Sequence, residues 1–61
     1  MTAREVEVLQ RVVAGDSNSE AGRALFIGER TVKTHMTSIL RKLEVTSRTQ
    51  AVARARDLGI S

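Results

Sequence analysis

Three helix-capping patterns within 61 residues constrain the fold of this chain more than any other feature. In each pattern a serine or threonine is followed three residues later by glutamate or glutamine, so that the two side chains can bind the free backbone N–H groups at the start of a helix. The three pairs are Thr2 and Glu5, Ser17 and Glu20, and Ser47 and Gln50. Proline is absent, and no segment alternates apolar and polar residues over the length of a strand. The sequence therefore predicts an all-α fold.

The first two expected helices are separated by a glycine. One begins after Thr2 and ends at Gly15, because glycine readily adopts the left-handed conformation that follows many helices. A shorter one begins after Ser17 and ends where Phe26-Ile27-Gly28 interrupts the pattern. The residues expected to face the core are Val6, Leu9 and Val13 in the first helix and Ala21, Ala24 and Leu25 in the second.

Two further helices follow. The third is expected from about Glu29 to Leu43, and the fourth runs from Ser47 to Gly59. Their expected core residues are Val32, Met36, Ile39, Leu40 and Leu43, then Ala51, Ala55 and Leu58. A short helix, a tight turn and a longer helix make a helix-turn-helix, so the second and third helices are assigned to that unit. Residues 1–61 are predicted to form one small four-helix domain.

The charge is distributed unevenly along the chain. Ten Lys and Arg residues oppose seven acids, a net charge of +3. Residues 1–29 carry three basic and five acidic residues, a balance of −2, whereas residues 30–56 carry seven basic residues and Glu44 alone, a balance of +6. A basic half of this kind indicates a polyanionic partner such as DNA. A solvated helix face is the alternative interpretation.

The expected third helix carries a polar strip opposite its apolar residues. Its members, three or four residues apart, are Arg30, Lys33, Thr34, Thr37, Ser38 and Arg41. The strip has no acid and no aromatic residue, and it combines basic groups with small hydroxyls. Arg and Lys bind phosphates or guanine, while Thr offers a hydroxyl and a methyl group to base edges. Any surface helix also has a polar face, so the strip alone does not settle the function.

The chain resembles the LuxR-type (GerE-type) helix-turn-helix domain, which ends many bacterial response regulators and quorum-sensing activators. The matching residues cover nearly the whole chain without a gap. They are Thr2, Arg4, Glu5, Glu7, Val8, Leu9, Gly15, Ser17, Asn18, Glu20, Leu25, Ile27, Thr31, Val32, Lys33, Thr34, His35, Ile39, Lys42, Leu43, Val45, Arg48, Ala51, Ala55 and Gly59. The resemblance implies double-stranded DNA as partner, the third helix in the major groove, and a place as the C-terminal effector domain of a longer regulator.

The resemblance also implies roles for individual residues. Lys33, Thr34 and Thr37 would reach base edges. The residues expected at phosphates are Arg30, Thr31, Arg41, Lys42 and Arg48, the last at a helix N-terminus. Similar domains pair through the last helix, which points to Val52 and Arg56 and to a homodimer on DNA.

Four positions depart from the family pattern. Met1 stands where leucine is common, and Ala21-Gly22 where Ile-Ala is common, which thins the packing of the second helix. Glycine at position 22 permits a closer helix approach but lowers helix propensity by up to ~1 kcal/mol relative to alanine. Gly28 replaces a capping serine, a change worth a few tenths of a kcal/mol. These departures bear on stability more than on function.

Other classes of protein find little support in the sequence. No cysteine, second histidine or base partner accompanies His35 or the serines, so we expect no enzyme, no metal site and no cofactor, and His35 is expected at the edge of the core. The longest apolar run is too short for a membrane span, and a cytoplasmic location is expected. The main alternative is a helical module docking on RNA polymerase or a sensory domain through the basic half, with a sigma-factor region as a related possibility.

Overall fold

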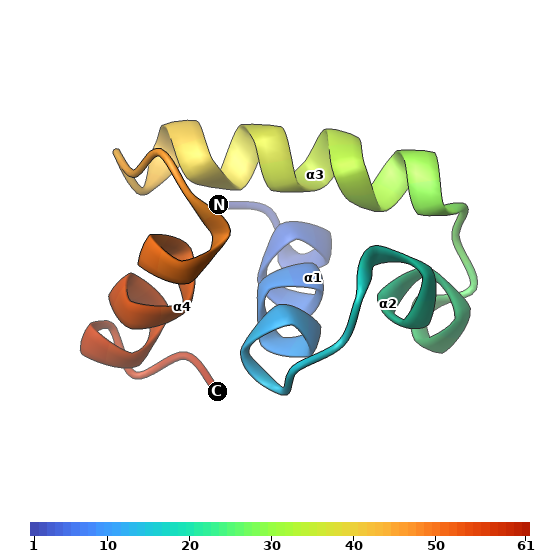
Figure 1. The fold of residues 1–61 in the computed structure, drawn as a ribbon, viewed down its shortest axis with the longest axis horizontal. Coiled ribbons are helices and arrows are strands. Elements are labelled where there is room, and N and C mark those ends of the chain that lie inside the picture. The colour runs from blue at the N-terminus through green and yellow to red at the C-terminus, as the bar shows by residue number, and fades with distance from the viewer.

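The computed structural model describes residues 1–61, which form four helices and no strand. They are α1 (Ala3–Val13), α2 (Asn18–Leu25), α3 (Glu29–Lys42) and α4 (Arg48–Asp57). The longest, α3, crosses the top of the molecule in Figure 1, and the other three lie beneath it. Helix α1 contacts all the others and separates α2 from α4. The all-α fold is confirmed, and no helix is long and apolar enough to cross a bilayer.

Side-chain caps start three of the helices. Thr2 and Ser17 form complete capping boxes, in which the N–H of Glu5 donates to Thr2 Oγ1 at 3.2 Å and that of Glu20 donates to Ser17 Oγ at 3.1 Å. The third box is only half formed. The N–H of Gln50 donates to Ser47 Oγ at 3.2 Å, but the side-chain Oε1 of Gln50 accepts from the N–H of Thr46 at 2.8 Å. Thr46 thus takes the partner that the sequence pattern assigned to Ser47.

The core lies where α3 crosses α1. Its nine buried apolar residues are Val8, Leu9, Val12, Ala21, Val32, Met36, Ile39, Ala51 and Ala55. Four expected core residues, Val13, Leu25, Leu40 and Leu43, are partly buried and pack against it, and Val6 is half-buried. Two expectations are wrong: Ala24 is exposed, and Leu58 is 52% exposed because it lies past the last turn of α4.

The turn between α2 and α3 packs against α2 at a glycine. A Cβ atom on the buried Gly22 would lie 2.7 Å from the carbonyl oxygen of Ile27. The close approach expected at this glycine is therefore present, and the atom that approaches it belongs to the backbone of the turn. Phe26 ends α2 in the left-handed conformation, with φ of 58°, and its side chain is 94% exposed. The turn that leads into α3 therefore depends on a glycine at position 22 and on a left-handed residue at position 26.

Candidate nucleic-acid interface

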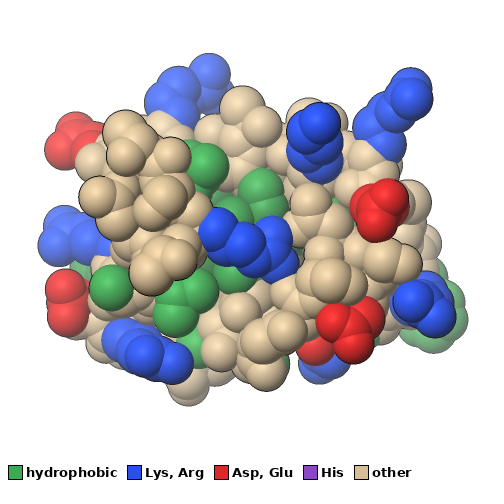
Figure 2. Space-filling model, in the orientation of Figure 1, with side chains coloured by type: hydrophobic (Ala, Val, Ile, Leu, Met, Phe, Trp, Pro, Cys, Tyr) green, Lys and Arg blue, Asp and Glu red, His purple; other side chains and the backbone are tan.

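The outer face of α3 points away from the rest of the molecule. Val32, Met36 and Ile39 turn inward, and at about 100° per residue the opposite side is centred on Arg30, Thr34, Thr37 and Arg41. All four are exposed, as are Lys33 and Thr31 on the two flanks. Figure 2 shows Lys and Arg side chains projecting from the upper edge, where α3 lies. We call Arg30, Thr31, Lys33, Thr34, Thr37 and Arg41 the α3 strip.

The basic groups of the α3 strip are free to bind a ligand. The side chains of Arg30, Lys33 and Arg41 make no hydrogen bond or ion pair within the chain. Ser38, which was expected in the same strip, is half-buried and not exposed. The strip therefore presents three unpaired positive charges without an acid among them.

The two central threonines already use their hydroxyl protons. Thr34 Oγ1 donates to the carbonyl oxygen of Arg30, and Thr37 Oγ1 donates to that of Lys33, both at 3.1 Å. A threonine in a helix commonly makes this bond to the preceding turn. Each side chain is thereby held in one orientation, with its oxygen still able to accept a hydrogen bond and its methyl group on an exposed residue.

Lys42, expected at a phosphate, joins the end of α3 to the start of α1. Its Nζ donates to Oε1 of Glu5 at 2.7 Å, and the same oxygen accepts from the N–H of Thr2 at 2.8 Å. The Glu5 side chain is only 5% exposed. The ammonium group of Lys42, with Ser38 and Thr2, holds the pKa of the Glu5 carboxyl well below its usual range. Lys42 lies at the edge of the α3 strip and has a structural partner.

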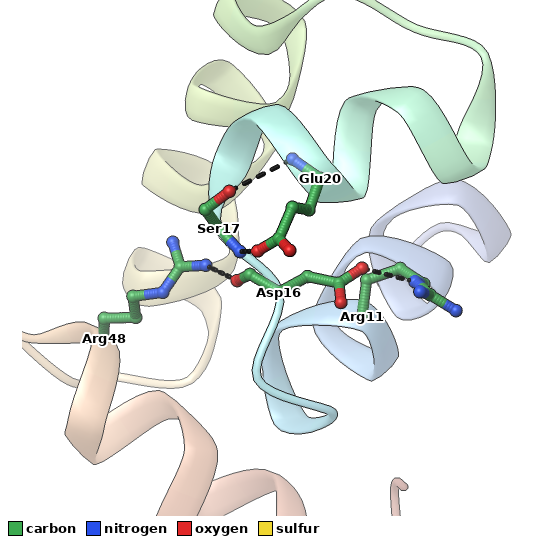
Figure 3. Close-up of polar contacts among 5 residues, drawn as sticks. All are labelled: Arg11, Asp16, Ser17, Glu20 and Arg48. Atoms are coloured by element: carbon green, nitrogen blue, oxygen red, sulfur yellow. Dashed lines mark hydrogen bonds and ion pairs between the residues drawn. The ribbon is translucent and has the colours of Figure 1, made fainter.

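Arg48 also has intramolecular partners. Its Nη1 donates to Oδ1 of Asn18 at 2.6 Å, and its Nη2 donates to the carbonyl oxygen of Asp16 at 2.5 Å. Figure 3 shows Arg48 reaching from α4 to Asp16, whose carboxylate accepts from Nε of Arg11 in α1 at 2.7 Å. The capping box of Ser17 lies beside this contact. Arg48 therefore ties the start of α4 to the α1–α2 connection.

These intramolecular partners were missed in the sequence analysis. Asn18 and Asp16 lie 30 and 32 residues from Arg48, and Glu5 lies 37 residues from Lys42. Helical spacing relates only residues three or four apart, so no pattern along the chain could have paired them.

The two residues expected at a pairing surface lie on one side of α4. Val52 is half-buried and packs against the core, while Arg56 is exposed. His35 is half-buried, in agreement with a place at the edge of the core.

Comparison with known proteins agrees with this geometry. Residues 1–55 match the family model of the bacterial regulatory proteins, luxR family (GerE). The transcriptional regulatory protein YhcZ of Bacillus subtilis is 55% identical over 51 residues, which are 84% of this chain and 24% of YhcZ. The CsgBAC operon transcriptional regulatory protein of Escherichia coli is 49% identical over 57 residues, 93% of this chain and 26% of that protein.

A solved structure shows the same arrangement of helices. The crystal structure of ChrA, a response regulator in a heme-sensing two-component system, is 45% identical and superposes with a TM-score of 0.91 over 98% of this chain and 30% of ChrA. The chain thus spans about a quarter of the length of the curated relatives named above. The helix-turn-helix assigned to α2 and α3, the free basic strip and the match over residues 1–55 agree, and the chain belongs to the luxR family of bacterial regulatory proteins.

Proposed function

We propose that this chain binds double-stranded DNA in a sequence-specific manner, as the effector domain of a longer bacterial transcriptional regulator. The observation that carries the proposal is the α3 strip, an exposed and acid-free face whose three basic groups have no partner within the chain. A helix of 14 residues is about 21 Å long and fits a major groove about 12 Å wide. In a helix-turn-helix the second helix of the unit enters that groove.

The residues divide into two groups by what they can reach. Lys33, Thr34 and Thr37 would contact base edges, as the family resemblance implies. Arg30, Thr31 and Arg41 would bind phosphates, and Lys42 and Arg48 would add to the same positive field while holding α1 and α4 in place. Sequence-independent phosphate contacts supply much of the affinity, and base contacts supply the discrimination.

The wider setting follows from the relatives. Because the chain spans only part of each relative, we infer that a receiver or ligand-sensing domain controls it in the full regulator, which acts in the cytoplasm. Pairing through Val52 and Arg56 of α4 would place two α3 helices on half-sites about 34 Å apart. Contact of the bound regulator with RNA polymerase is part of the same proposal.

Titration of the chain into a labelled duplex, followed by fluorescence anisotropy at several salt concentrations, tests the proposal. Each lost phosphate contact lowers the slope of log K against log salt by about 0.9, so Arg41→Ala should lower it by that amount. Arg54→Ala removes the same charge from α4 and should leave the slope nearly unchanged. Lys33→Ala should change which base is preferred at one position.

Absence of binding at low salt, from a chain shown to be folded by circular dichroism, would contradict the proposal. The alternative function, docking on RNA polymerase or a sensory domain, also predicts no DNA binding. It further predicts that substitutions in the α3 strip change capture of a protein partner.

A further inference from the structure

The hydrogen bonds of the two central threonines limit what each can offer a base. Thr34 Oγ1 and Thr37 Oγ1 give their protons to backbone carbonyls one turn earlier, both at 3.1 Å. A hydroxyl has one proton and two lone pairs, so each oxygen is left as an acceptor. The remaining heavy atom on each Cβ is a methyl group, and both residues are exposed on the face of α3 that points away from the core.

A threonine in this state complements an A·T pair better than a G·C pair. In the major groove an A·T pair presents the thymine methyl group beside a donor at adenine N6, whereas a G·C pair presents the acceptors N7 and O6 of guanine and a donor at cytosine N4 but no methyl group. A methyl group with an acceptor beside it matches the first pair. Against guanine, two acceptors would face each other unless the threonine broke its bond to the backbone.

We propose that Thr34 and Thr37 determine specificity by packing their methyl groups against thymine methyls, while their hydroxyl oxygens accept from the paired adenine. This inference rests on the proposed function and deepens it. The two residues are three apart, about 4.5 Å along the helix, close to the 3.4 Å step between neighbouring base pairs. The threonines therefore read neighbouring A·T pairs.

Lys33 adds the opposite preference at the flank of the strip. Its ammonium group has no partner within the chain and only donates, so it suits the N7 and O6 acceptors of guanine. The preferred half-site is thus an A·T step next to a guanine.

The test removes the thymine methyl without touching base pairing. A preferred duplex is first selected by the chain from a random 20-base-pair library. Each thymine in that duplex is then replaced, one at a time, by deoxyuridine, which lacks only the methyl group. One buried methyl contributes enough to change Kd about four-fold. We expect a weakening of that size at one or two adjacent thymines and none at the others.

Two matched variants identify the protein side of the contact. Thr37→Val keeps the methyl group and loses the hydroxyl, so it should retain the thymine–uracil difference. Thr37→Ser keeps the hydroxyl and loses the methyl, so the difference should disappear at one position. The same pair at Thr34 should act on the neighbouring thymine. Circular dichroism and thermal unfolding check that each variant is folded.

The outcomes separate this inference from the function on which it rests. A selected site that contains no thymine, or one in which every deoxyuridine replacement leaves Kd unchanged, overturns the methyl contact while DNA binding stands. Equal thymine–uracil differences in Thr37→Val and Thr37→Ser, and again in the Thr34 pair, overturn the assignment to these residues. Failure to select any site overturns the proposed function and this inference with it.

Discussion

At residue 22 the backbone of the α2–α3 turn leaves no room for a side chain. Gly22→Ala would gain helix propensity, but its Cβ would meet the carbonyl oxygen of Ile27 at 2.7 Å. Because the contact is with backbone, the turn must move, and we expect a loss of about 1–3 kcal/mol in the free energy of unfolding by urea. Gly28→Ala adds the same atom without a backbone clash, since its Cβ would lie 3.9 Å from the nearest atom, Thr31 Oγ1, and as a poorer N-cap it should lose less than about 1 kcal/mol. Equal stabilities of the two variants would contradict this account.

Phe26 combines backbone strain with an exposed ring. Its φ of 58° places a residue with a Cβ in the left-handed region, which costs roughly 1 kcal/mol, while the 94% exposed side chain contributes little packing. Phe26→Gly should therefore raise the midpoint of thermal unfolding. Phe26→Ala removes the ring but keeps the Cβ, so it should show no such gain. Unfolding midpoints of both variants below that of the wild type would contradict this account, because they would show that the ring stabilises the turn.

Among the elements, α4 has little burial of its own, and Arg48 ties its start to the α1–α2 connection. Only Ala51 and Ala55 of this helix are fully buried. Arg48→Ala removes two hydrogen bonds from a charged, half-buried group to Asn18 and Asp16, and we expect it to lower the free energy of unfolding by about 1.5–3 kcal/mol. Arg54→Ala, with the same charge change on the same helix, should lower it by less than about 0.5 kcal/mol.

Binding measurements complete the comparison of these two arginines. If Arg48 served only a phosphate, Arg48→Ala would weaken DNA binding without changing stability. Loss of stability together with weakened DNA binding would show that Arg48 both holds α4 in place and binds a phosphate.

Features that lie within one helix could be predicted from the sequence, and contacts between helices could not. Helix starts at Thr2 and Ser17, the buried residues of α3 and five of the six residues of the α3 strip were predicted, because each depends on spacings of three or four residues. On α1 the predicted face was partly wrong: Val8 and Val12 are buried, since this helix contacts three others and its apolar face is broad. The partners of Lys42 and Arg48 come from other helices, so only the fold reveals them.

For the whole molecule, the Glu5–Lys42 contact makes stability depend on pH. The pKa of Glu5 is lowered from an ordinary value of 4.5, chiefly by the Lys42 hydrogen bond. A carboxyl whose pKa is lower in the folded state stabilises fully above the unfolded value and loses that contribution as pH falls. The chain should therefore lose stability progressively below about pH 4.5. Glu5→Gln should be less stable at pH 7 and should lose less on acidification.

Glu7→Gln is the control for this prediction, because Glu7 is exposed and makes no hydrogen bond through its side chain. The free energy of unfolding by urea is measured from pH 7 to pH 3 for the wild type, Glu5→Gln and Glu7→Gln. Plotted against pH, it should give parallel curves for the wild type and Glu7→Gln. A Glu5→Gln curve parallel to both would mean that another group governs acid unfolding.

The pairing on DNA that we propose depends on which side of α4 faces a second copy. Val52 and Arg56, four residues apart, share one side of the helix, and Arg54 projects from another. On a duplex with two selected half-sites one helical turn apart, about 34 Å, we expect cooperative binding of two copies. Arg56→Glu should abolish that cooperativity, because it reverses a charge at the pairing surface. Arg54→Glu makes the same change of charge, so both variants should weaken binding to a single half-site alike, and only the first should lose cooperativity.

Moving one half-site by five base pairs places it on the opposite side of the duplex and should separate the two copies in the wild type as well. Cooperativity that survives Arg56→Glu but not the five-base-pair shift would place the pairing surface on another helix.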